Sequence, residues 1–251
     1  MINVKNSQQL AAMREAGKIT GEALLVAREH LRDGVSTAEV DAAVRRYIEK
    51  CGARPSFLGY AGFTGSACIS INDEVIHGIP SPRRYIHDGD IVKVDVGAYY
   101  KGFHGDSAKT FPVGHVSEEA LRLIEATKGS FYEAVKYAVA GMRIGDIGSA
   151  VEAHVTKYGY TVVREYEGHG VGSALHEDPG VPNFGRAGHG PRLCNGMTIA
   201  IEPMVNAGTA DIRVLKDGWT VVTADGRLSA HYEHTVAVTP DGPVLLTDVG
   251  E

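Results

Sequence analysis

The sequence predicts an α+β fold in which two related halves share one curved antiparallel sheet, with helices covering its outer face. Two pairs of segments match at the same offset of 107 residues, from position 34 to 141 and from position 88 to 195. Within each half, two amphipathic helices precede a turn and a short alternating strand. The hydrophobic share of 43% and the charged share of 22% suit a globular chain with a sizeable core. We therefore expect a single catalytic domain over residues 1–251, with pseudo-twofold halves of about 1–113 and 114–251.

Four helices are predicted, two in each half. Apolar residues at helical spacing predict the first helix of each half over residues 6–31 and 117–140. The second helix of each half is predicted over residues 37–50 and 145–157, by the same spacing. The residues expected at the ends of these second helices are Thr37 and Gly145 as N-caps, and Gly52 and Gly159 as left-handed C-caps.

Each half also places acidic residues at equivalent positions. Asp95 and Glu202 end the two matching strands, so each half contributes one strand carboxylate. Asp106 follows Asp95 after a glycine-rich turn, and a strand out and back would bring the two side by side. Glu233 occupies the position in the second half that is equivalent to Asp106, at an offset of 127 residues instead of 107. Asp95 and Asp106 alone could be solvated acids on a hairpin, but the apolar strands around Glu202 and Glu233 make free acids costly there.

His169 completes this group, because the glycines on both sides let the backbone approach a bound ligand closely. Four carboxylates and one imidazole without thiolates suit two hard-to-borderline divalent ions, such as Mn, Fe, Co or Zn. Two neighbouring ions of this kind can activate a water and polarise a carbonyl, which is hydrolytic chemistry. His176 follows in the same region, whereas an isolated histidine elsewhere is more simply structural.

Composition excludes several classes of function. The net charge of −6 and the pI near 6.0 argue against nucleic acid as the main partner. The apolar runs are too short to cross a membrane, and residues 1–7 lack the layout of a secretory signal. The cysteines are odd in number and form no CxxC pair, which predicts a reducing, cytoplasmic setting: Cys51, Cys68 and Cys194.

Seven spaced segments, in order along nearly the whole chain, resemble the methionine aminopeptidases of the M24 metallopeptidases. They are His77–Pro80, Val94–Gly97, Gly105–Ala108, Gly168–Gly172, His176–Pro179, Ile201–Met204 and Tyr232–Thr235. The chain is similar to the short type I form, without a zinc-binding extension or the long type II insertion. The resemblance implies the pita-bread fold and a two-metal enzyme that removes the N-terminal methionine before a small second residue.

The resemblance also assigns roles to individual residues. It implies two metal ions, of Co, Mn, Fe, Zn or Ni, held by five ligands: Asp95, Asp106, His169, Glu202 and Glu233. Asp106 and Glu233 would bridge the two ions. Glu202 would serve as general base and then acid. His176 would stabilise the developing oxyanion, and His77 would help to protonate the leaving amine. A capping histidine before a turn is the alternative for His77.

A methionine pocket needs an apolar wall, because a thioether offers little to hydrogen-bond. The resemblance nominates Tyr60, Phe63, Cys68 and Trp219, with Phe57 and Leu175 nearby. Ordinary core positions are the alternative for these residues. The chain departs from the family pattern where an aromatic, a cysteine and a histidine are frequent: Leu175, Phe57 and Ala61. It also has Thr64-Gly65 where a Pro-Lys pair is common.

Other implications concern partners and alternatives. Similarity around Asn72, Glu74 and Ser229 suggests a monovalent cation site. The substrates would be nascent polypeptides near the ribosome exit, and the enzyme would be a monomer. Two other functions stay open: a peptidase of the same fold that cleaves X-Pro bonds, and a binding module without metals. Cleavage of an X-Pro peptide would indicate the first, and the absence of divalent-ion binding would indicate the second.

Overall fold

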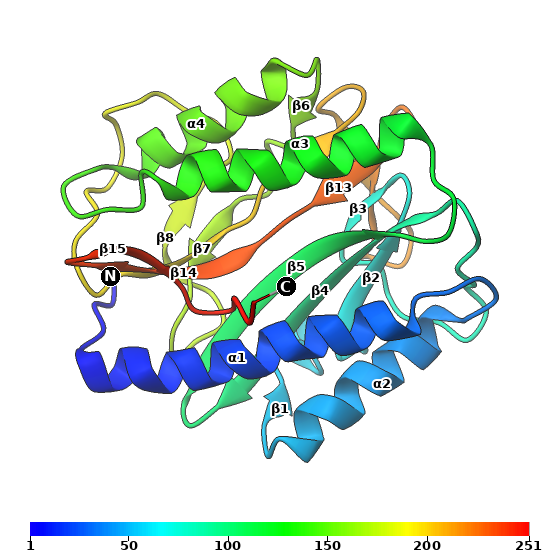
Figure 1. The fold of residues 1–251 in the computed structure, drawn as a ribbon, viewed down its shortest axis with the longest axis horizontal. Helices are drawn as coiled ribbons and strands as arrows, with labels where there is room; N and C mark the ends of the chain where they lie inside the picture. The colour runs from blue at the N-terminus through cyan, green and yellow to red at the C-terminus, as the bar shows by residue number, and fades with distance from the viewer. Residues whose placement is uncertain (251) are drawn as a thin grey trace.

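The structure is a computed structural model that describes residues 1–250. Its four helices are α1 (Ser7–His30), α2 (Thr37–Lys50), α3 (Glu118–Val135) and α4 (Ile144–Thr156). The strands lie between the α1–α2 pair and the α3–α4 pair (Figure 1). Within the described residues, no helix combines the length and the apolar composition that a membrane crossing requires. The four predicted helices are thereby confirmed, with α3 ending a few residues early.

The strands pair antiparallel throughout. Those of the first half, with one 3-10 turn η1 (Tyr60–Gly62), are β1 (Arg54–Pro55), β2 (Ala67–Ile71), β3 (Glu74–Ile76), β4 (Ile91–Tyr100) and β5 (Phe103–Pro112). Those of the second half are β6 (Thr161–Val162), β7 (Gly168–Gly170), β8 (Glu177–Val181), β9 (Thr198–Ile201), β10 (Met204–Asn206), β11 (Ile212–Val214), β12 (Val221–Thr223), β13 (Ser229–His231), β14 (His234–Thr239) and β15 (Gly242–Leu245).

Backbone pairing divides these strands into four groups. The two that build the site are β1-β4-β2, with β5 beside β4, and β15-β14-β9-β7-β8. Hydrogen bonds join them between β5 and the start of β14: the Glu233 N–H donates to the Ala108 carbonyl at 2.8 Å, and the Thr235 hydroxyl donates to the Asp106 carbonyl at 2.8 Å. The acidic residues of both halves therefore meet at this junction.

The hairpin of β4 and β5 has the predicted geometry. Lys101 and Gly102, with φ of 49° and 89°, form its two-residue turn. Asp106 lies opposite Gly97 in the register, two residues from Asp95, so both carboxylates point to the same face of the sheet. The predicted side-by-side placement of Asp95 and Asp106 is confirmed.

Helix α1 lies directly on β5 because two glycines allow it. A Cβ on Gly105 would stand 2.7 Å from the Gly17 Cα, a distance that side-chain carbons do not tolerate. The approach fixes the strand at the residue before Asp106. The apolar cores follow the halves: one cluster draws on residues 19–113, and the other mainly on residues 120–238.

Two of the predicted helix ends are wrong. The N-cap of α2 is Ser36, whose hydroxyl accepts from the Glu39 N–H while the Glu39 carboxylate accepts from the Ser36 N–H, a capping box. The N-cap of α4 is Arg143, whose N–H donates to Asp146 at 2.8 Å. In both helices an acceptor three residues on decides where the helix begins. The C-terminal glycines Gly52 and Gly159 have φ of 73° and 79°, as predicted.

Candidate active site

A cavity of about 470 Å³ opens where the two halves meet. Its floor holds acidic residues and its wall is largely apolar, the arrangement expected of an enzyme site. The structure brings all of the predicted site residues to it: Asp95, Asp106, His169, Glu202, Glu233, His77, His176, Tyr60, Phe63, Cys68, Trp219, Phe57 and Leu175.

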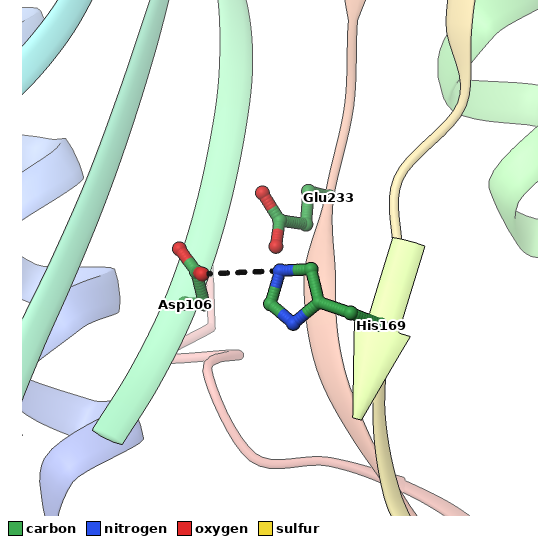
Figure 2. Close-up of side chains that lie close together, drawn as sticks. All are labelled: Asp106, His169 and Glu233. Atoms are coloured by element: carbon green, nitrogen blue, oxygen red, sulfur yellow. Dashed lines mark ion pairs between the residues drawn. The ribbon is translucent and has the colours of Figure 1, made fainter. Parts of the chain in front are cut away.

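The acid cluster is assembled from five separate chain segments. Asp95 and Asp106 come from β4 and β5, His169 from β7, Glu202 from the end of β9, and Glu233 from the link between β13 and β14. Figure 2 shows the His169 ring pointing between the carboxylates of Asp106 and Glu233. The His169 Nε2 lies 3.7 Å from Asp106 Oδ2 and 3.5 Å from Glu202 Oε1. One ligand atom each of Asp106, His169 and Glu233 lies within 4.8 Å of the others.

Burial and mutual repulsion disfavour the ionised carboxylates. Burial raises the pKa of Asp95 from 3.8 to about 7. Burial, followed by repulsion from neighbouring carboxylates, holds the pKa values of Asp106, Glu202 and Glu233 well above their ordinary range. Burial lowers the pKa of His169 to about 4, so its imidazole is neutral near pH 7 and keeps a free lone pair.

Buried oxygens in the cluster lack hydrogen-bond partners. Among the described residues, Asp95 Oδ1, Asp106 Oδ1 and Glu233 Oε1 are buried and accept no hydrogen bond. Buried acceptors of this kind are rare in proteins, and their carboxylates can ionise only beside positive charge. Divalent cations would supply both the charge and the missing bonds. An oxygen-rich set with an imidazole therefore fits the divalent transition ions predicted from the sequence.

Two histidines border the cluster. The His176 ring lies 4.1 Å from that of His169, between ring centroids, and its Nδ1 lies 2.7 Å from the Tyr60 hydroxyl oxygen. His77 lines the same cavity, with its ring edge-on to Tyr166 and Trp219 at 5.6 and 6.1 Å. Burial lowers the pKa values of both histidines, that of His77 to about 4, so both are neutral near pH 7.

An apolar wall faces these polar groups. The residues Phe57, Phe63, Cys68 and Leu175 form one buried cluster, against which Ile79 and Trp219 pack. The Phe63 and Trp219 rings meet edge to face at 5.1 Å. The predicted wall residues therefore lie together, although Tyr60, at 44% exposure, stands at the rim and contacts His176 instead.

Sequence reasoning missed His231. Its Nε2 lies 3.8 Å from Glu202 Oε2 and 3.9 Å from Glu233 Oε2, so it belongs to the acid cluster. The available signal was its spacing, because residues two apart on an extended chain point to one side and Glu233 follows two residues later.

A buried lysine occupies the region of the expected monovalent ion. The Lys93 ammonium donates to the carbonyl oxygens of Asn72 at 2.7 Å and Ser229 at 3.0 Å. The Glu74 carboxylate pairs with Arg84 and accepts from the Ile71 N–H. The chain thus places its own nitrogen donor between these two carbonyls, and burial lowers the pKa of Lys93 to about 7.

Comparison with known proteins agrees with this geometry. The model of metallopeptidase family M24 matches residues 11–240. A methionine aminopeptidase of Clostridium acetobutylicum is 51% identical over 247 residues, 98% of this chain and 99% of that protein. Methionine aminopeptidase 1 of Bacillus subtilis is 48% identical over 249 residues, 99% of this chain and all of that protein.

Among solved structures, a methionine aminopeptidase is more similar to this chain than a prolidase is. The crystal structure of methionine aminopeptidase from Thermotoga maritima superposes with a TM-score of 0.97 at 41% identity, covering 99% of this chain and 100% of that one. Prolidase from Pyrococcus furiosus superposes with a TM-score of 0.80 at 25% identity, covering 99% of this chain but 66% of that one. The pita-bread fold predicted from the sequence is confirmed.

Proposed function

Because the chain belongs to metallopeptidase family M24, and within it to the methionine aminopeptidases, we propose that the acid-floored cavity is its catalytic site. The enzyme removes the N-terminal methionine from polypeptides. The observation that most supports this function is that four carboxylates and an imidazole line the same cavity as an apolar wall. The likeness to the prolidase is weaker in identity and coverage, which favours methionine release over X-Pro cleavage.

Five residues would hold two divalent ions: Asp95, Asp106, His169, Glu202 and Glu233. Asp106 and Glu233 come from opposite halves and meet at the junction of the sheets, which places them to hold ions together with ligands of both halves. The bound ions would supply Lewis acidity toward the scissile carbonyl and the attacking water. We propose Co, Mn, Fe, Zn or Ni, since this ligand set accepts each of them. No monovalent ion is needed beside Lys93, whose ammonium already donates to the two carbonyls.

Glu202 is the proposed general base. Its side chain is nearly buried, at 13% exposure, and burial raises its pKa, so the carboxylate gains from accepting a proton. It would take a proton from the attacking water and deliver it to the leaving amine. A group at this place must be able to hold a proton reversibly, which a carboxylate does and an amide does not.

His176 and His77 are proposed to act on the substrate from the two sides of the cavity. When the Tyr60 hydroxyl donates to His176 Nδ1, the ring proton resides on Nε2, which can then donate to the developing oxyanion. Neutral His77 would donate toward the leaving amide nitrogen. Both proposals need neutral imidazoles, and burial keeps both rings neutral near pH 7.

The methionine side chain would rest against the wall of Phe57, Phe63, Cys68 and Leu175, closed by Trp219 and with Tyr60 at the rim. Burying a side chain of this size gives about 1.5–3 kcal/mol of binding. A wall of rings and a buried thiol offers no partner to a charged or strongly polar first residue. Such a wall would favour an apolar first residue such as methionine.

The test is metal restoration with two peptides. The protein is stripped of metal, and Mn, Co, Fe, Zn or Ni is added back while release from Met-Gly and Ala-Pro peptides is followed in parallel. Metal-dependent release of methionine alone supports the proposal. Cleavage of only the Ala-Pro peptide would reassign the enzyme to proline chemistry, and no cleavage with any of these ions would leave a binding module.

The cellular setting is a further part of the proposal. New polypeptides begin with methionine in the cytoplasm, so we propose that the enzyme acts there on nascent chains, near the ribosome and as a monomer. Sedimentation of the purified protein, alone and with ribosomes, tests the oligomeric state and the association. A dimer, or complete separation from ribosomes carrying nascent chains, would contradict these points.

A further inference from the structure

His231 belongs to the acid cluster but lies behind the cavity wall. Its residue exposure is 2%, and it is not among the residues that line the cavity. Among the described residues, neither ring nitrogen of His231 has a hydrogen-bond partner. An imidazole that is buried and unpartnered at both nitrogens is rare, which indicates a role that the ion-free arrangement does not satisfy.

The backbone holds this imidazole firmly. The His231 N–H donates to the Thr110 hydroxyl at 2.9 Å, and that hydroxyl donates to the His231 carbonyl at 2.8 Å. On the other side, His231 pairs with Met204 of β10. Strand β13 is thereby tied to β5, the strand that carries Asp106, which fixes the backbone from which the ring projects toward the acids.

Glu202 lies between two imidazoles. Its Oε1 is 3.5 Å from His169 Nε2, on the cavity side, and its Oε2 is 3.8 Å from His231 Nε2, on the far side. An imidazole carries at least one N–H whether it is neutral or protonated, so the His231 ring can serve as a donor. A hydrogen bond requires a separation of about 3.2 Å or less, so a small approach would close it.

His231 could be a metal ligand or a residue that positions a ligand, and its place relative to the cavity distinguishes the two. All five proposed metal ligands line the cavity, whereas His231 does not. Carboxylates that bind metals usually accept hydrogen bonds from residues behind them, and these bonds set the orientation of the carboxylate. An ionised carboxylate also accepts more strongly than a protonated one, so ion binding would draw Glu202 and the His231 N–H together.

We propose that His231 is a positioning residue for Glu202: in the metal-loaded protein its Nε2–H donates to Glu202 Oε2 and leaves Oε1 turned toward the cavity. The inference rests on the proposed role of Glu202 as general base. It assigns His231 no contact with the substrate, so its loss affects turnover and metal affinity more than substrate binding.

Two substitutions test the donor. His231→Leu removes the N–H at similar volume, whereas His231→Gln keeps an N–H donor of similar reach. We expect His231→Leu to lower kcat and the affinity for Mn, measured by calorimetry, by about 10–100-fold, with the KM for a Met-Gly peptide unchanged. His231→Gln restores both quantities to near the wild-type values. His154→Leu is the matched control, because His154 Nε2 is also buried and unpartnered but lies on α4, and it leaves kcat unchanged.

Three outcomes would overturn the inference. Wild-type kcat and Mn affinity in His231→Leu would show that the imidazole has no role. A Gln variant as impaired as the Leu variant, with loss of a nitrogen signal in the electron spin-echo spectrum of bound Mn, would make His231 a ligand. A rise in KM alone would place it against the substrate. If wild type itself releases no methionine, the proposed function fails. The Mn affinities of wild type and the His231 variants, measured by calorimetry, still test the role of His231.

Discussion

Replacing Asp95 by asparagine should stabilise the ion-free protein while destroying its metal site. Asp95 is buried among other acids, and its pKa is raised from 3.8 to about 7. Since the folded-state pKa lies above the unfolded one, the protonated group contributes stability below pH 4, and that contribution is lost as the pH rises to 7. Asparagine carries no charge and escapes this loss.

The shift of about three pKa units corresponds to roughly 4 kcal/mol at pH 8 and to roughly 2 kcal/mol at pH 5. For a domain of this size, about 2–4 °C of melting temperature accompanies each kcal/mol, so the Asp95→Asn variant should melt about 8–16 °C higher at pH 8. The buried histidines titrate in the opposite sense below pH 6.5, but they do so in both proteins and cancel in the difference.

The assay is thermal unfolding in chelator at pH 5 and pH 8, with the exposed Asp241→Asn variant as control. Excess Mn should narrow the gap at pH 8 and reverse the order at pH 5, because only wild type gains about 2.7 kcal/mol at an ion concentration one hundred times Kd. A variant no more stable than wild type at pH 8, or a gap that is the same at both pH values, would refute the argument. Equal stabilisation of both proteins by Mn would show that Asp95 is not a ligand.

Three further predictions concern turnover. Glu202→Gln should lower kcat by about 10²–10⁴-fold in a methionine-release assay without lowering the melting temperature, because an amide cannot carry the proton; near-normal kcat would end its assignment as base. At fixed metal, kcat/KM should fall as the pH drops below about 6, because protons compete with metal for Asp95 and the other raised carboxyls; a profile flat through pH 5 would contradict this. Exchanging sodium and potassium for choline should leave kcat unchanged, because Lys93 already donates to the Asn72 and Ser229 carbonyls; a loss of activity restored by potassium would contradict it.

Local patterns in the chain were sufficient for much of the fold. The helices follow from apolar spacing, and Gly52 and Gly159 end α2 and α4 because few other residues accept positive φ. The hairpin that brings Asp95 and Asp106 together follows from its glycine-rich turn. The N-caps were misplaced because Ser36 and Arg143 depend on acceptors three residues along the helix, a detail that spacing does not resolve.

The sequence by itself determined which residues could carry the chemistry, since a repeated pattern puts acids at matching positions of two halves and the resemblance covers them all. Only the tertiary structure decided how those residues are tuned. His231 approaches Glu202, Lys93 reaches the Ser229 carbonyl, and Tyr60 meets His176, although each pair is distant in the chain or belongs to different strands. The physical reason is that burial and the meeting of strands from opposite halves set the pKa values and hydrogen bonds of these groups, and neither quantity is a property of the local sequence.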